Sequence, residues 1–302
     1  MDFLRKNRMT ITVAGVVLLI LVRMLVLLLG TDAVNGYSNS VFWSVCQIAA
    51  VVLFVLLLGL PVLMGGKGSA PMGDSRGLRI GAGIAAAVFF VYTLVSLIEL
   101  LMQFGSAVMM YQMLIPWAAI LKVVLSILAV GFFYLLARCG SVLPSAASLI
   151  LILGPIGLYI FRLIDSFMEI TLNPSVDTYA LLVVSGGLTL FFLSNLGRAL
   201  LEGKVKRIFL ISSSLSALAL SLSSVATLIF SLLQAPVYAG LIGWADLACD
   251  IAMMLVAVLV GQSGKPVFVS RRRHAMVGSA VPTPRRRGRY IPKHYAKYEE
   301  IA

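Results

Sequence analysis

Charge is the scarcest property of this 302-residue sequence: only 12% of its residues are Asp, Glu, Lys or Arg, whereas 60% are hydrophobic. Soluble domains carry about 25% charged and about 45–50% apolar residues, so a soluble enzyme is excluded. The mean hydropathy of +1.02 also excludes disorder over most of the chain, because disordered segments have low hydrophobicity. The composition therefore predicts a polytopic membrane protein.

Cysteine and histidine are also rare. The three cysteines, Cys46, Cys139 and Cys249, are too few and too far apart for a disulfide framework or a metal cluster. Both histidines, His274 and His294, lie near the C-terminus, which excludes a Ser–His dyad or a His-ligated metal inside the predicted helices. The sequence contains no P-loop lysine motif and no G-x-S-x-G motif. We therefore expect neither a metal nor a cofactor.

Long apolar runs, by contrast, are abundant. A bilayer core of about 30 Å needs roughly 20 apolar residues per helix, and by this measure the sequence predicts an all-α fold with eight transmembrane helices. The runs are too long, and too rich in Leu and Ala, for the strands of a membrane barrel. The predicted helices are residues 9–29, 41–64, 78–102, 114–137, 144–168, 179–200, 205–233 and 241–260.

The loops on one side of these helices contain no Lys or Arg: residues 30–40, 103–116, 169–178 and 234–240. The loops on the other side are basic. Because positively charged loops stay in the cytoplasm, we expect both termini inside, in a plasma membrane of the bacterial inner-membrane type. We interpret residues 9–29 as a retained first helix, because the run is longer than a signal-peptide core and no A-x-A-like site precedes Tyr37.

A two-helix unit recurs along the sequence. The segments LIELLMQ, LIDSFME and LIFSLLQ begin at Leu97, Leu163 and Leu228, at spacings of 66 and 65 residues. Each is followed by a short loop and a helix with an early aromatic residue. We interpret residues 1–264 as a bundle of four tandem, parallel hairpins near 9–67, 78–138, 144–200 and 205–264. The alternative is chance resemblance among Leu-rich helices.

Apart from the basic residues at the cytoplasmic ends of the predicted helices, the few charged residues associated with these helices lie in the half of the membrane that faces the outside. Each costs about 2.5–3.5 kcal/mol on insertion scales, so such residues usually face partners or cavities. We predict that they form a substrate site or an ion-pair network. The set comprises Arg23, Glu99, Lys122, Arg162, Asp165, Glu169, Asp246 and Asp250.

Helical spacing places several of these residues on common faces. Arg162, Asp165 and Glu169 form a stripe at i, i+3 and i+7, and Asp246 and Asp250 are one turn apart. A similar polar stripe on the third helix contains Tyr92, Ser96, Glu99 and Gln103. The eight charges sum to −2, which favours a cationic or zwitterionic ligand, or a carboxylate kept protonated by desolvation.

Three functions are compatible with this pattern. The first is a small-solute transporter or permease subunit with a polar site in the outer half of the membrane. The second is a non-catalytic membrane scaffold or sensor whose charges are structural. The third is an intramembrane enzyme that uses paired carboxylates, such as Asp165 with Asp246 or Asp250, as acid and base. The sequence does not identify a substrate.

Residues 265–302 form a basic tail with ten Lys or Arg and two Glu. Because its prolines and repeated charges disfavour a packed core, we expect a disordered cytoplasmic segment. Such a segment binds anionic lipid headgroups at about 1 kcal/mol per basic residue. A membrane or cytosolic protein partner stays open, and nucleic acid is not expected because no nucleic-acid-binding motif occurs. The predicted lipid contacts are Arg271, Arg272, Arg273, Arg285, Arg286 and Arg287.

Overall fold

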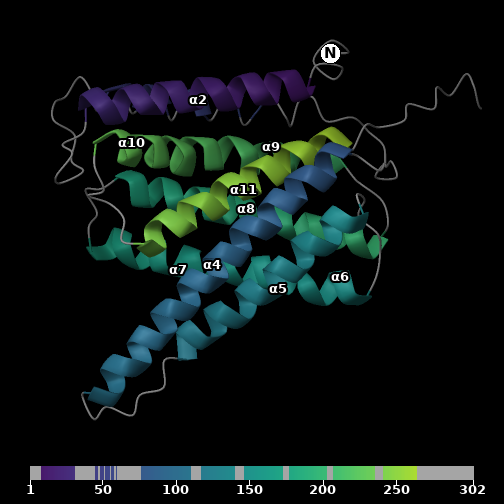
Figure 1. Ribbon diagram of the computed structural model, residues 1–302. Coiled ribbons are helices and arrows are strands. Elements are labelled where there is room, and N and C mark those ends of the chain that lie inside the picture. Colours follow the sequence, from purple (N-terminus) through teal and green to yellow (C-terminus); the bar gives the residue numbers. More distant parts are fainter. Residues whose placement is uncertain are drawn as a thin grey trace, which may run out of the picture. The chain divides into compact units, whose positions relative to one another are not determined.

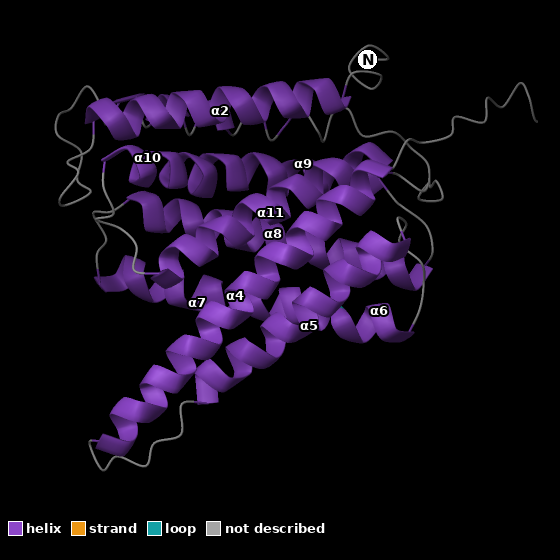
Figure 2. Cartoon of the chain, viewed as in Figure 1, coloured by secondary structure: helices purple, strands orange, loops and turns teal. Residues whose placement is uncertain are grey.

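The computed structural model describes residues 8–30, 76–109, 117–139, 146–172, 177–202, 207–234 and 241–263, together with 45, 46, 48–50, 52–54, 56, 57 and 59. All of these residues are helical except for one turn residue, Ile152 (Figure 2). The chain divides into two units, Met1–Pro266 and Val267–Ala302, and every described residue belongs to the first. The arginines predicted to contact lipid, at 271–273 and 285–287, lie outside the described residues.

The described helices confirm an all-α, multi-pass membrane protein. Seven of them are long and apolar enough to cross a membrane. Within the predicted span 41–64, the described residues, all between 45 and 59, are helical. The described elements are α2 (Arg8–Gly30), α4 (Arg76–Met109), α5 (Trp117–Cys139), α6 (Ala146–Leu151), α7 (Leu153–Leu172), α8 (Asp177–Glu202), α9 (Arg207–Leu220), the π-helix η1 (Ser221–Val225), α10 (Ala226–Gln234) and α11 (Leu241–Ser263).

Six of the described helices pack in a closed ring. α4 packs on α5, α5 on α7, α7 on α8, α8 on α9, α9 on α11, and α11 again on α4. α2 lies outside this ring, against α9, η1 and α10 (Figure 1). Each of the six helices therefore has one face toward a common centre, and polar side chains on those faces can meet there.

The predicted fifth span is broken into two helices at Ile152. α6 ends at Leu151, four residues before Pro155. Proline has no backbone N–H and its ring clashes with the carbonyl of the residue four positions earlier, so the helix cannot continue regularly through Leu151. Just after the break, α7 comes very close to α5: a Cβ atom on Gly154 would clash with the backbone nitrogen of Ala129.

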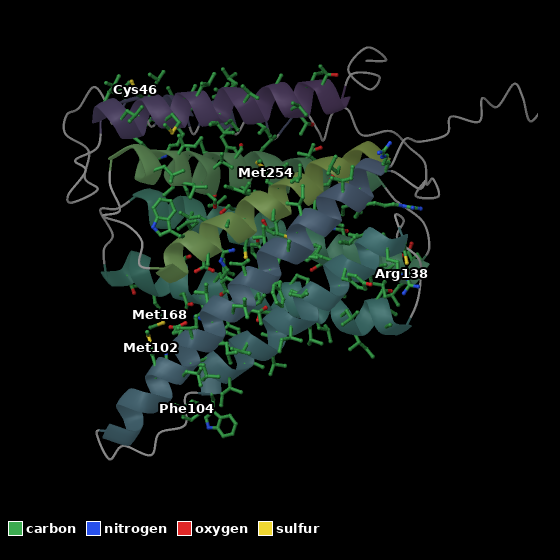
Figure 3. All side chains as sticks on the ribbon, viewed as in Figure 1. Cys46, Met102, Phe104, Arg138, Met168 and Met254 are labelled. Atoms are coloured by element: carbon green, nitrogen blue, oxygen red, sulfur yellow. The ribbon has the colours of Figure 1, made fainter. Side chains whose placement is uncertain are left out.

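We call the end of the helices where Arg138 lies the basic end (Figure 3). Aromatic rings pack between neighbouring helices of the ring. The rings of Phe89 and Phe133 stack at 5.0 Å between centroids, and those of Phe192 and Phe209 lie 5.9 Å apart. All four side chains are buried. These aromatic rings belong to the apolar core, whereas the buried Asp250 and the neighbouring Arg162 lie farther from the basic end.

The outward faces of the helices are apolar, as lipid contact requires. Leu21 of α2 and Val124 of α5 are among many exposed aliphatic residues. α4 continues past residue 102 to Met109, and its last turns extend beyond the neighbouring helices (Figure 1). Met102 and Phe104 lie on this extension (Figure 3), and Met102 is 70% exposed.

Candidate functional site

Arg162 of α7 is the centre of a polar cluster inside the ring. Its Nη1 and Nη2 atoms donate to Oδ1 and Oδ2 of Asp250 at 2.6 and 2.8 Å, a bidentate arrangement that is among the strongest protein ion pairs. Its Nε lies 3.1 Å from Oδ1 of Asp246, one turn earlier on α11. The guanidinium also lies 5.1 Å from the ring centroid of Tyr159, in cation–π range. The guanidinium of Arg162 thus contacts the carboxylates of both Asp246 and Asp250.

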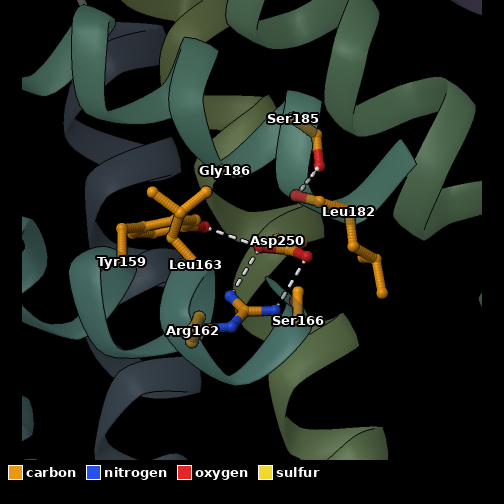
Figure 4. A pocket seen from close by; sticks show the side chains of 8 residues that line it. All are labelled: Tyr159, Arg162, Leu163, Ser166, Leu182, Ser185, Gly186 and Asp250. Carbon is orange, nitrogen blue, oxygen red and sulfur yellow. Dashed lines mark hydrogen bonds and ion pairs between the residues drawn. The ribbon is translucent and has the colours of Figure 1, made fainter. Parts of the chain in front are cut away.

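Asp250 is the more enclosed of the two carboxylates of the cluster, with its side chain 3% exposed against 27% for Asp246. Besides the two bonds from Arg162, Oδ1 accepts from the Tyr159 hydroxyl at 2.8 Å and Oδ2 accepts from the Ser224 hydroxyl at 2.5 Å. Tyr159, Arg162 and Asp250 point toward one another in Figure 4. These four donors compensate the large cost of removing a carboxylate from water.

The cluster joins helices whose backbones pack on different neighbours. α7 packs on α5 and α8, whereas α11 packs on α4, α9 and η1. Tyr159 and Arg162 on α7, at i and i+3, face Asp246 and Asp250 on α11, at i and i+4. The long side chains therefore cross the centre of the ring.

Ser224 comes from a local irregularity that our reading of the sequence did not anticipate. Residues Ser221–Val225 form a π-helical turn between α9 and α10, and all five are buried. Single π turns inside α-helices occur frequently at functional sites. The run of serines was the only signal for it. Tyr159 was also missed, although its position three residues before Arg162 places it on the predicted stripe.

A second ion pair lies beside this cluster. Nζ of Lys122 on α5 is 2.8 Å from Oδ2 of Asp165 on α7, with side chains 25% and 54% exposed. Lys122 is also within electrostatic reach of Asp246. The predicted stripe on α7 is thus shared between two partners, since Arg162 faces α11 and Asp165 faces α5.

Glu99 and Arg23 are on helices other than those that carry these pairs. Glu99 accepts a bond of 3.2 Å from Gln103 on its own helix. Arg23 is buried on α2, which lies outside the ring. Glu169 is in α7, but its side chain lies outside the described part of the chain. Of the predicted residues, the structure therefore brings together Arg162, Asp246 and Asp250, with Lys122 and Asp165 beside them.

A small cavity adjoins the Arg162–Asp250 pair between α7, α8 and α11 (Figure 4). The volume that water can occupy in it is about 20 Å³, and its walls include Ser166, Ser185 and Gly186. A single water needs roughly 10–15 Å³ on this measure, so the cavity has room for one water and not for an organic solute. Among the described residues no group of His, Cys, Asp and Glu is arranged to hold a metal ion.

The serines of α9 and η1 serve mainly to pack the helix. Ser212, Ser213 and Ser221 each donate to the backbone carbonyl three residues earlier, at 2.7–2.9 Å. Serine hydroxyls that bond back in this way satisfy themselves within the helix. Ser214 and Ser216 bond to threonines of α2 and α8, whereas Ser224 donates to a carboxylate, that of Asp250.

Comparison with protein-family models, with curated proteins and with solved structures finds no match for this chain. The class of the protein is consequently inferred from its own sequence and structure. Its long apolar helices make it an integral multi-pass membrane protein. Its ring of helices surrounds a buried arginine–aspartate cluster beside a cavity of one-water size.

Proposed function

We propose that the protein is a small-solute transporter or permease subunit whose binding site is the Arg162–Asp250 pair at the centre of the ring. The bidentate pair, whose side chains are 16% and 3% exposed, is the observation that carries this proposal. A buried ion pair is often replaceable by apolar residues without loss of stability, so stability alone is a weak reason for its presence. Ionisable residues within membrane helices typically mark substrate or ion pathways.

In this proposal the structure represents a closed conformation, in which no solute can reach the Arg162–Asp250 pair. Arg162 and Asp250 neutralise each other, and the neighbouring cavity holds only a water. In this proposal the apolar core, which includes the stacked rings of Phe89 and Phe133, separates the pair from the basic end. A solute therefore reaches the pair from the opposite end, and binding requires Arg162 and Asp250 to separate.

Water accessibility of the cavity tests this proposal without knowledge of the solute. We would replace the native cysteines by alanine, introduce Ser185→Cys, and treat intact cells with a membrane-impermeant methanethiosulfonate reagent. Transport predicts that this thiol is labelled from outside, because the cavity opens during the cycle. Asp250→Asn in the same background should accelerate labelling, since it weakens the closing ion pair.

Ser212→Cys is the matched control. Ser212 is as buried as Ser185 and likewise bonds to a carbonyl three residues earlier, but it lies on α9 near the basic end. It should stay unlabelled under the same conditions. If Ser185→Cys is as unreactive as the control, even with Asp250→Asn, the proposed function is wrong.

The second candidate is a membrane scaffold or sensor in which the charges only lock the helices together. The four hydrogen bonds that Asp250 accepts from Arg162, Tyr159 and Ser224 favour it, because the protein itself supplies a donor to both carboxylate oxygens. This candidate predicts an unreactive Ser185→Cys, so the labelling experiment separates the two.

A further inference from the structure

We infer that the solute is a small zwitterion, bearing one carboxylate and one ammonium group, that binds between Arg162 and Asp250. This inference rests on the proposed function and names its substrate class. Both charged groups of the pair line the same cavity, next to the hydroxyls of Ser166 and Ser185.

The guanidinium of Arg162 already holds a carboxylate in the geometry that a solute would use. Nη1 and Nη2 form a planar fork that binds the two oxygens of Asp250, and a free carboxylate fits the same fork. Asp246 contacts the other edge, at Nε. Arg162 therefore keeps one protein partner when Asp250 leaves, and its fork becomes available for the solute.

Asp250 offers the complementary half of the site. After separation it retains the hydroxyl donors of Tyr159 and Ser224, and an ammonium group replaces the guanidinium. The single ion pair between Arg162 and Asp250 is then replaced by two, one between Arg162 and the solute carboxylate and one between Asp250 and the solute ammonium group. Arg162, Asp246 and Asp250 together carry one excess negative charge, so a simple anion would raise that excess at a large desolvation cost. A simple cation would pair with Asp250 but leave the fork of Arg162 without a carboxylate. A zwitterion provides a partner for both groups and leaves the net charge of the centre unchanged.

Gly186 sets the size of this solute. It lines the cavity on α8, and a Cβ atom at this position would lie 3.3 Å from Cδ1 of Leu163, so any side chain narrows the space. The next residue, Gly187, has nothing within 4 Å of a Cβ atom. The two glycines are adjacent on one helix, but only the first faces the proposed site.

The test measures the Tm of the purified full-length protein in detergent. Glycine and alanine are the probes, with acetate and methylammonium at equal concentration and ionic strength as controls. A ligand that binds the folded state raises the Tm with a saturating concentration dependence. We expect such a rise for at least one zwitterion and none for either control ion. An equal rise with acetate or methylammonium alone, or no rise with either zwitterion, would overturn the inference.

Substitutions at the two glycines locate the binding. Gly186→Leu should abolish the Tm rise and Gly187→Leu should preserve it; loss in both, or in neither, contradicts the proposed location. If Gly186→Leu lowers the basal Tm severely, Gly186→Ala replaces it and should weaken the apparent affinity. The labelling experiment distinguishes a failure of the substrate class from a failure of the proposed function. A reactive Ser185→Cys without any zwitterion effect refutes only the substrate class, whereas an unreactive one refutes the proposed function as well.

Discussion

Because Arg162 serves two carboxylates, its removal should cost far more stability than removal of Asp250. Arg162→Gln leaves Asp246 and Asp250, one turn apart on α11, without the base that contacts both. Removing one partner of a buried pair costs about 3–5 kcal/mol. Asp250→Asn leaves Arg162 beside Asp246, and the amide oxygen still accepts from its neighbours. We expect a cost of about 1–3 kcal/mol, typical of a weakened charge-assisted hydrogen bond.

The free energy of unfolding would be measured by titrating the protein from mild detergent into SDS, followed by far-ultraviolet circular dichroism. The double variant Arg162→Gln/Asp250→Asn should be more stable than Arg162→Gln alone, because it removes one of the two uncompensated carboxylates. Lys122→Gln is the control. Its ion pair with Asp165 is partly exposed, so its loss should cost about 0–1 kcal/mol. Equal costs for Arg162→Gln and Asp250→Asn would refute the assignment of one base to two acids.

Two further predictions follow from packing and from charge. Gly154→Ala should lower the free energy of unfolding by at least about 1–3 kcal/mol, as overpacking does, because its Cβ would meet the backbone of α5. The control is Gly83→Ala, where a Cβ atom has open space, and it should be neutral or stabilising. Similar losses of stability at both sites would contradict this prediction. The basic loops predict that both termini are cytoplasmic. A green fluorescent protein fused to the C-terminus should therefore fluoresce, and alkaline phosphatase fused after residue 106 should be active. The reverse pattern would disprove this orientation.

The membrane class and the helices are local properties, and this is why the sequence predicts them well. An apolar run of about 20 residues has to form a helix in lipid, because every backbone polar group needs an internal partner. The predicted ends differ from the observed ones by a few residues in most helices. The larger differences have local causes too: α4 continues to Met109 because no proline occurs before Pro116, and α6 ends at Leu151 because of Pro155.

The candidate site shows the limit of such reasoning. Spacing along one helix places Asp246 and Asp250 on one face, and that much is visible in the sequence. The same spacing suggests a single stripe for Arg162 and Asp165, yet these two residues contact different helices. The π turn that supplies Ser224 has no clear sequence signature.

From the sequence alone it follows that the chain is a multi-pass membrane protein with a few ionisable side chains within its helices. The tertiary structure alone decides which acid meets which base. Arg162 and Asp250 are 88 residues apart in the chain, and several other bases and acids of the same set are equally compatible with pairing. Only the closed ring of helices brings these two to a common centre, because the distances across a bundle depend on how all of its helices pack.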